Sequence, residues 1–164
     1  MGLTGYKELF NQNIPLPSVS TLGRHLGNWN FESGILHEVF EFLKSKVATF
    51  EKDVHKDCIL TLDEVSITKG KVFDLRSKSY LGFVTLVDEN DQNVQPEYAE
   101  TFLVFMLAGI AQRWKQPVAY YYTNKKTYGK LYKPVILDIL KKSEYIDLIV
   151  WAIISDLGAV NQAM

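Results

Sequence analysis

The sequence predicts a mixed α/β domain whose sheet contains antiparallel and parallel strands. Three observations lead to this prediction. A segment with helical spacing precedes several runs rich in branched and aromatic residues, turn-like segments separate the early runs, and a helical segment precedes the last run. Short connections favour antiparallel neighbours, whereas a helix between two strands is typical of a parallel crossover.

The size of the chain fits one ordinary domain with an appendage. It has 164 residues, of which 47% are hydrophobic and 23% are charged, as in globular proteins. We expect a helical segment over residues 1–56 and the main domain over residues 57–164. The start of the chain lacks a signal-peptide pattern and its apolar runs are too short to span a bilayer, so we expect a soluble intracellular protein without membrane association.

The first third of the chain has helical patterns. Pro15 and Pro17 interrupt them, because proline is excluded from a helix interior, and Ser18 or Ser20 would cap the helix that follows. From Gly34, the segment ILHEVFEFLKSKVATFEK has apolar residues near helical spacing. The residues expected on its apolar face are Ile35, Val39, Phe42, Leu43, Val47 and Phe50.

Four runs with strand composition follow this helix. They are CILTLDEVSI, SYLGFVTLVD, TFLVFMLAGI and QPVAYYYT. The segments KGKVFDLRSKS and DENDQNVQPE separate the early runs and have the composition of turns. We therefore expect these strands to pair as antiparallel hairpins or as a meander.

A helix and one more strand complete the predicted order. KPVILDILKKSEY is expected to form a helix with Pro134 near its first turn and lysines near its end. The run DLIVWAIIS, residues 147–155, is nearly all apolar, as in a strand that is covered on both faces. We therefore expect this strand in the centre of the sheet.

The charge distribution and the cysteine content limit which kinds of binding site the chain can form. The formal net charge is -1, but residues 79–110 carry five acids and no Lys or Arg, whereas residues 111–142 carry eight Lys or Arg and the single acid Asp138. A solvated surface and a nucleic-acid surface both fit this division. Cys58 is the only cysteine, so an internal disulfide and a CxxC zinc site are excluded, and a reducing compartment fits.

Acids near strand ends are the candidate chemical site. Asp63 and Glu64 are adjacent in LTLDEVSI, and strand alternation directs one of them to the packed face, where a carboxylate needs a partner or a metal. Asp156 follows the last strand, at an end where ligands bind in open α/β sheets. If the two strands are neighbours, Asp63 and Asp156 would converge on Mg²⁺ or Mn²⁺. Otherwise, Asp63 is an edge acid in water and Asp156 caps the following helix.

Seven blocks of sequence carry a family resemblance. They are IPLPSVSTLGRHL, GILHEVFEFLKSKV, LTLDEVSI, YLGFV, LVFMLAGI, WKQPVAYYYT and SDLGAVN. Their order and spacing, over most of the chain, resemble the P-element transposase family, which includes the transposase-like THAP-domain proteins. The resemblance implies a ribonuclease H-like domain and a nuclear protein that cleaves and transfers DNA strands with bound Mg²⁺ or Mn²⁺. It implies that Asp63 is the first catalytic and metal-binding acid and Asp156 the second, and that Glu64 is no ligand.

The sequence also departs from the family pattern. It ends at Met164, so we expect a truncated, amino-terminal half of the core that lacks the third acid and the insertion that binds GTP in the family. Asp138 and Asp147 are the nearest substitutes in sequence, and both are expected at the wrong ends of their elements. We expect no zinc-binding THAP module in this sequence, because one cysteine cannot build it. We expect such a chain to cut DNA weakly or not at all.

Two segments offer candidate DNA contacts. Residues 15–26 resemble the helix-turn-helix portion of the family and provide Arg24, although a structural role fits equally. The second segment interleaves basic residues with Trp114 and the tyrosines of residues 120–122, and such surfaces contact phosphates and bases together. Its basic residues are Lys115, Lys125, Lys126 and Lys130.

The sequence thus leaves several functions open. The first is a transposase-type nuclease domain that binds DNA and, once completed by other residues, cleaves it with Mg²⁺. The second is a domesticated, non-enzymatic module that binds DNA or another protein. An unrelated α/β domain is the third. A homo-oligomer is also expected, because a sheet edge exposed by truncation favours self-association.

Overall fold

The computed structural model describes residues 6, 8, 11–12, 15–27, 32–75, 77–88, 96–124 and 129–155. The chain divides into two compact units, Met1–Phe31 and Glu32–Met164. The first contains helix α2 (Val19–Gly27), whose predicted cap is Ser18: the Thr21 backbone N–H donates to Ser18 Oγ at 3.1 Å. The predicted division of the chain at residues 56 and 57 stays a prediction.

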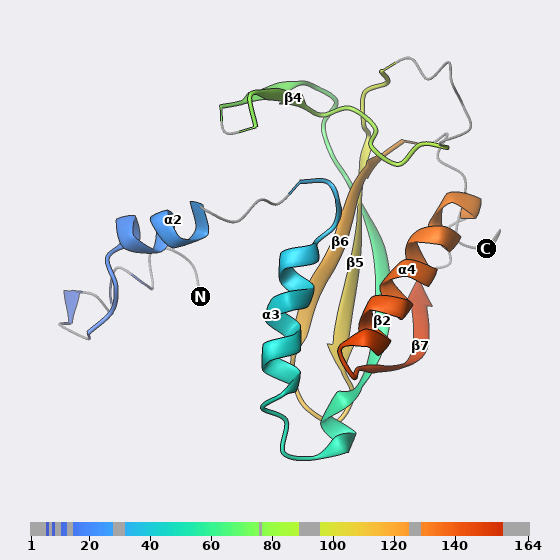
Figure 1. The fold of residues 1–164 in the computed structure, drawn as a ribbon. Helices are drawn as coiled ribbons and strands as arrows, with labels where there is room; N and C mark the ends of the chain where they lie inside the picture. Colours follow the sequence, from blue (N-terminus) through green and yellow to red (C-terminus); the bar gives the residue numbers. More distant parts are fainter. Residues whose placement is uncertain are drawn as a thin grey trace. The chain divides into compact units, whose positions relative to one another are not determined.

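The second unit is built on a five-stranded mixed sheet, as the sequence predicts (Figure 1). The strand order is β1-β6-β5-β2-β7. β2, β5 and β6 are antiparallel neighbours, whereas β7 runs parallel to β2. The strands are β1 (Gly34–Ile35), β2 (Asp57–Ser66), β5 (Thr101–Gly109), β6 (Lys115–Thr123) and β7 (Ile149–Ser155). Helix α4 lies between β6 and β7 in the chain, which explains the one parallel pair.

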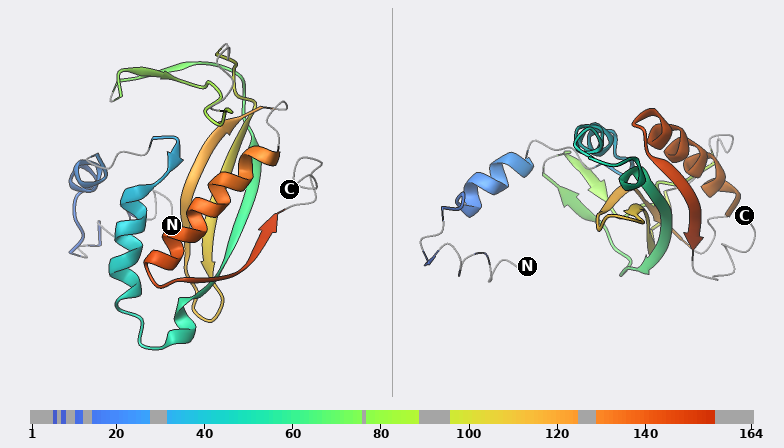
Figure 2. Two further views of the ribbon diagram at one scale, coloured as in Figure 1. Left: turned by 45° about the vertical axis from the view of Figure 1, so that its right-hand side comes forward. Right: turned by 90° about the horizontal axis from the view of Figure 1, so that it is seen from below.

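Helices α3 (His37–Val47) and α4 (Tyr132–Tyr145) cover the same face of the sheet (Figure 2). Alternate side chains of β2 and β5 face these helices and form the core with them. The buried residues of α3 are Val39, Phe40, Leu43 and Val47. The prediction that Phe42 is on this apolar face is wrong: helical spacing groups Phe40 with the core, and Phe42 is about half exposed. No helix in the described part of the chain is long and apolar enough to cross a membrane.

A small second sheet was not predicted. β3 (Val72–Asp74) and β4 (Ser79–Leu81) pair as an antiparallel hairpin, although the first was interpreted as a turn. Asp74 Oδ2 accepts hydrogen bonds from the Ser77 backbone N–H at 3.1 Å and from Ser77 Oγ at 2.7 Å, which closes the turn. β4 ends before Gly82, whose φ of 107° interrupts the long strand that was predicted there. We call residues 69–81 the basic hairpin.

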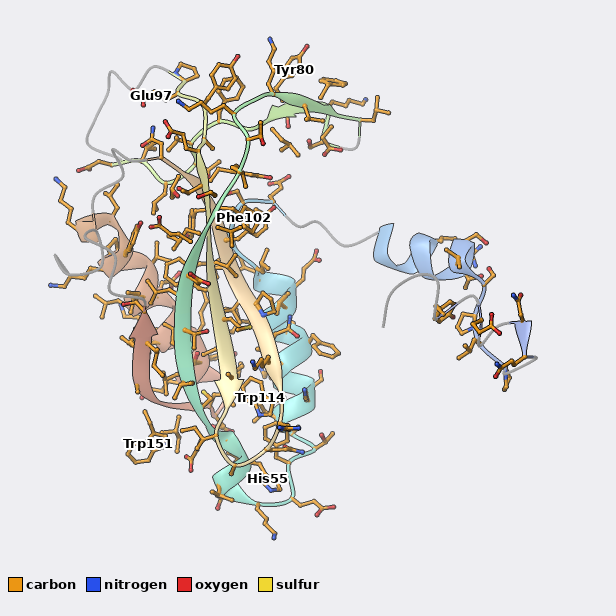
Figure 3. All side chains as sticks on the ribbon, turned by 180° about the vertical axis from the view of Figure 1, so that it is seen from behind. His55, Tyr80, Glu97, Phe102, Trp114 and Trp151 are labelled. Carbon is orange, nitrogen blue, oxygen red and sulfur yellow. The ribbon has the colours of Figure 1, made fainter. Side chains whose placement is uncertain are left out.

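Among the described strands, β7 lies at the edge of the sheet, so within the described sheet it is not the central strand covered on both faces that the sequence predicts. Its described neighbour is β2 alone, and most of its side chains are exposed. Trp151 is 67% exposed, and its indole N–H donates to Asp57 Oδ1 at 2.9 Å. Figure 3 shows Trp151 at the outer side of this strand. An apolar run identifies a strand but does not show whether its second edge is paired.

Candidate functional site

Asp63 and Glu64 lie on opposite faces of β2. Leu60 and Leu62 are buried beneath the helices, so strand alternation places Glu64 on the helix-covered face and Asp63 on the open face. Asp63 is exposed, and its Oδ1 accepts a hydrogen bond from the Glu64 backbone N–H at 2.9 Å. The carboxylate of Asp63 therefore faces solvent on the side of the sheet that the helices do not cover.

Glu64 is the acid on the packed face, and α4 supplies its partner. The hydroxyl of the buried Tyr132 donates to Glu64 Oε1 at 2.5 Å. A carboxylate that accepts such a hydrogen bond has the partner that partial burial requires. Sequence reasoning missed Tyr132, because it lies 68 positions away and the packing of α4 alone brings the two together.

The pairing of β2 determines what lies beside Asp63. On one side, Asp63 is opposite Val104 of β5. On the other side, the last described pair of the parallel β2–β7 ladder is Leu62 and Ser155. Asp156, the second predicted acid, follows Ser155 in sequence and lies outside the described residues.

A solvent-facing carboxylate has the hard oxygen donors that Mg²⁺ and Mn²⁺ prefer, so Asp63 fits a ligand of either ion. Among the described residues, no three His, Cys, Asp or Glu side chains gather as a metal site. The sequence substitutes for a third acid do not join Asp63: Asp147 precedes β7, at the end opposite Ser155, and Asp138 is exposed on α4.

The predicted DNA-contacting lysines do not form one described patch. Lys115 begins β6, whereas Lys130 follows the far end of that strand and lies 3.9 Å from Asp88 Oδ2. Lys125 and Lys126 lie outside the described residues, and Arg24 is exposed in the first unit. The role of each of these residues in DNA binding stays a prediction.

The aromatic residues of that segment have separate roles. Trp114 is buried at the end of the sheet where β6 begins, so its ring is part of the core (Figure 3). Tyr120 and Tyr122 lie on the open face, with ring centroids 4.9 and 5.5 Å from Phe102 of β5. Burial, followed by nearby Tyr122 and Glu32, raises the pKa of Tyr120 above the usual value of 10.0, so this phenol stays protonated further into alkaline pH than a free tyrosine.

The chain is similar to known proteins over most of its length. Residues 31–164 match the family described as TNP-like, RNase H N-terminal domain. The Transposable element P transposase of Drosophila melanogaster is 27% identical over 163 residues, which are 99% of this chain and 19% of that protein. The DNA transposase THAP9 of Homo sapiens is 26% identical over 152 residues, which are 92% of this chain and 16% of that protein.

A solved structure has the same arrangement of elements. A chain of the Drosophila P element transposase strand transfer complex superposes with a TM-score of 0.67 and 25% sequence identity, over 98% of this chain and 31% of that chain. The described sheet and its helices therefore have the fold of the corresponding part of that protein. The chain spans less than a third of each of these relatives.

Proposed function

Because this chain belongs to the TNP-like, RNase H N-terminal domain family, we propose that it forms part of the catalytic core of a DNA transposase. In this proposal, Asp63 and Asp156 are the first two metal-binding acids, and DNA is the substrate. The likeness to two transposases and to a strand transfer complex supports the assignment.

The observation that carries the proposal is the register of the β2–β7 ladder. Leu62 and Ser155 are paired in parallel strands, and each is followed in sequence by one of the two acids. Paired residues of neighbouring strands point to the same face, and the next residues point to the other face. Continuation of the ladder by one residue would bring Asp63 and Asp156 together on the open face, away from the helices.

The chain's own groups have distinct tasks in this site. Asp63 provides an anionic oxygen ligand on a face that a DNA phosphate can approach, and Asp156 provides the second. Strand alternation places Glu64 on the opposite face, where the Tyr132 hydroxyl donates to it, so the adjacent acid does not compete for the ion. Bound Mg²⁺ or Mn²⁺ supplies activation of water or of a 3′ hydroxyl and stabilises charge at the phosphate.

The proposal is tested by calorimetric titration of the folded chain with Mn²⁺. Asp63→Asn and Asp156→Asn should each lower the affinity for Mn²⁺ at least tenfold, because each removes an anionic ligand. Glu64→Gln is the matched control, since it removes the neighbouring charge on the other face and should leave the affinity unchanged. Equal Mn²⁺ affinity in the parent and in Asp63→Asn would contradict the proposed site.

A domesticated module that binds DNA without cleaving it is the second candidate. The exposed basic hairpin favours it, because binding to phosphates needs lysines and no metal. Absence of Mn²⁺ binding by a folded chain that still binds DNA would favour this module over the nuclease. For either candidate, we propose a nuclear location, and exclusion of a fluorescent fusion from the nucleus would contradict it.

A further inference from the structure

The basic hairpin exposes large apolar side chains and lysines together. It continues from β2, the strand that carries Asp63, and projects from the end of the main sheet (Figure 1). Leu75 at its turn is 83% exposed, and the side chains of Val72, Phe73 and Tyr80 are also about half exposed or more. Packing within the described unit leaves these side chains exposed, and exposed apolar groups of this size are typical of a surface that binds a partner.

Charge accompanies these apolar groups. Residues 67–83 contain a single acid, Asp74, which closes the turn. Their basic residues are Lys69, Lys71, Arg76 and Lys78, of which Arg76 lies outside the described residues. The ring centroids of Phe73 and Tyr80 are 5.2 Å apart, and Lys71 Nζ lies 5.0 Å from the centroid of Tyr80. The hairpin therefore presents cations and aromatic rings together.

The base of the hairpin is held to the segment that leads into β5. The Ala99 backbone N–H donates to the Gly82 carbonyl at 2.9 Å, and the Val84 N–H donates to the Glu97 carbonyl at 2.9 Å. The rings of Phe83 and Tyr98 stack with centroids 5.2 Å apart. Figure 3 shows Tyr80 on the projecting hairpin and Phe102 on the main sheet. These contacts fix the direction in which β3 and β4 leave the base of the hairpin.

We propose that the basic hairpin is a DNA-binding arm that lies against duplex DNA beside the Asp63 site. A two-stranded ribbon fits the major groove of B-DNA, lysines neutralise phosphates, and exposed rings contact sugars and bases. Charge complementarity and direct continuity with the strand of Asp63 select DNA as the occupant. This inference rests on the proposed function, because it assigns a further contact to the same substrate.

The test is fluorescence anisotropy of a labelled DNA duplex of mixed sequence, titrated with the chain at several KCl concentrations. The variant with both Lys71→Gln and Lys78→Gln should bind more weakly. Its slope of log affinity against log salt should be smaller in magnitude by about 0.9 for each phosphate contact that is lost. The matched control removes Lys133 and Lys141, two exposed lysines of α4, by the same change and should keep the parent slope.

A ring variant separates charge from stacking. Tyr80→Leu removes the aromatic ring but keeps apolar bulk and every charge. It should therefore weaken DNA binding several-fold and leave the slope of log affinity against log salt unchanged. An unchanged affinity and slope in the double lysine variant would overturn the inference, and so would equal losses in that variant and its control. If the double lysine variant lost binding to phosphatidylserine vesicles but bound DNA as the parent does, the hairpin would be a membrane-binding surface and the inference would be overturned.

Failure of this inference is distinguishable from failure of the proposed function. Metal binding by Asp63 and Asp156 is measured with Mn²⁺ and without DNA, so it does not depend on the hairpin. A parent chain that binds Mn²⁺ but no DNA would overturn the arm and leave the metal site standing. A parent chain that binds DNA through the hairpin but binds no Mn²⁺ would confirm the arm and contradict the metal site.

Discussion

The Tyr132 hydroxyl donates a hydrogen bond to Glu64 Oε1 and thereby joins α4 to the strand that carries Asp63. Tyr132→Phe removes this donor and leaves the carboxylate on the packed face without it. We expect a loss of about 1.5–3 kcal/mol in the free energy of unfolding, as for hydrogen bonds to charged groups. Urea unfolding monitored by circular dichroism measures this. Tyr145→Phe is the control, because Tyr145 is 72% exposed at the end of α4, and an equal loss there would contradict the role of Tyr132.

Gly82 occupies a position that other residues fit poorly. Its φ is 107°, and a Cβ on it would collide with the carbonyl oxygen of Gly70. We expect Gly82→Ala to lower the free energy of unfolding by about 1–3 kcal/mol, through backbone strain and displacement of the base of the hairpin. Gly70→Ala is the matched control, since a Cβ there meets nothing within 4 Å. Thermal unfolding compares the two, and similar melting temperatures would contradict the prediction.

In the part of the chain that the structure describes, the outer edge of β7 has no partner strand, which predicts self-association. It is seven residues long and carries no charge or proline, the devices that protect edge strands. We expect Ile154→Lys to shift the chain toward monomer in sedimentation velocity experiments, because a lysine opposes pairing with a second edge. Leu137→Lys on α4 is the control, since Leu137 and Ile154 are 47% and 49% exposed. A parent chain that is monomeric at all concentrations would contradict this prediction.

The thiol of Cys58 predicts a dependence of stability on alkaline pH. Burial, and next the charge of Asp57, raises the pKa of Cys58 from 9.0 to about 12 in the folded chain. Between these values, the unfolded thiol ionises and the folded thiol stays protonated, so this contribution to stability is complete below pH 9 and is lost as pH rises toward 12. We expect the free energy of unfolding to fall with rising pH more steeply in the parent chain than in Cys58→Ala, by up to about 1.4 kcal/mol per pH unit.

Urea unfolding of both chains, from pH values below the unfolded pKa of 9.0 toward the folded pKa of about 12, measures that slope. The comparison cancels the titration of the lysines and tyrosines, which both chains share. Parallel pH profiles for the parent and Cys58→Ala would show that the thiol does not contribute.

Periodicity in the sequence was sufficient to predict the main elements but not their surroundings. The spacing of apolar residues predicts α3 and α4, and branched residues predict β2, β5, β6 and β7. The same pattern places one of two adjacent acids on the packed face. That this acid is Glu64, and that Tyr132 is its partner, depends on tertiary packing, which spacing does not reveal. Convergence of Asp63 and Asp156 stays a prediction for the same reason.

The elements for which the structure differs from the prediction are determined by single residues or by neighbouring strands, which the spacing of apolar residues does not show. Gly82 ends a strand that composition would continue, and Asp74 closes a turn after β3, a short strand that has the composition of a turn. The apolar composition of β7 resembles that of a central strand, and only the order of the described strands places it at an edge. Short pairs of branched and aromatic residues, Val72–Phe73 and Tyr80–Leu81, on both sides of the DLRSKS segment are the signal by which the hairpin could be found.

The parallel pairing of Leu62 with Ser155 has a consequence for the order of folding. The β5–β6 hairpin closes a short loop, whereas the β2–β7 ladder closes a loop that contains most of the second unit, at a higher entropic cost. We therefore expect β7 to join the sheet last and to leave it first. Pulsed hydrogen exchange should show amides of β5 and β6 protected before those of β7, and simultaneous protection would contradict this order. The proposed metal site would then be the last part of the domain to assemble, and divalent cations would stabilise mainly this late step.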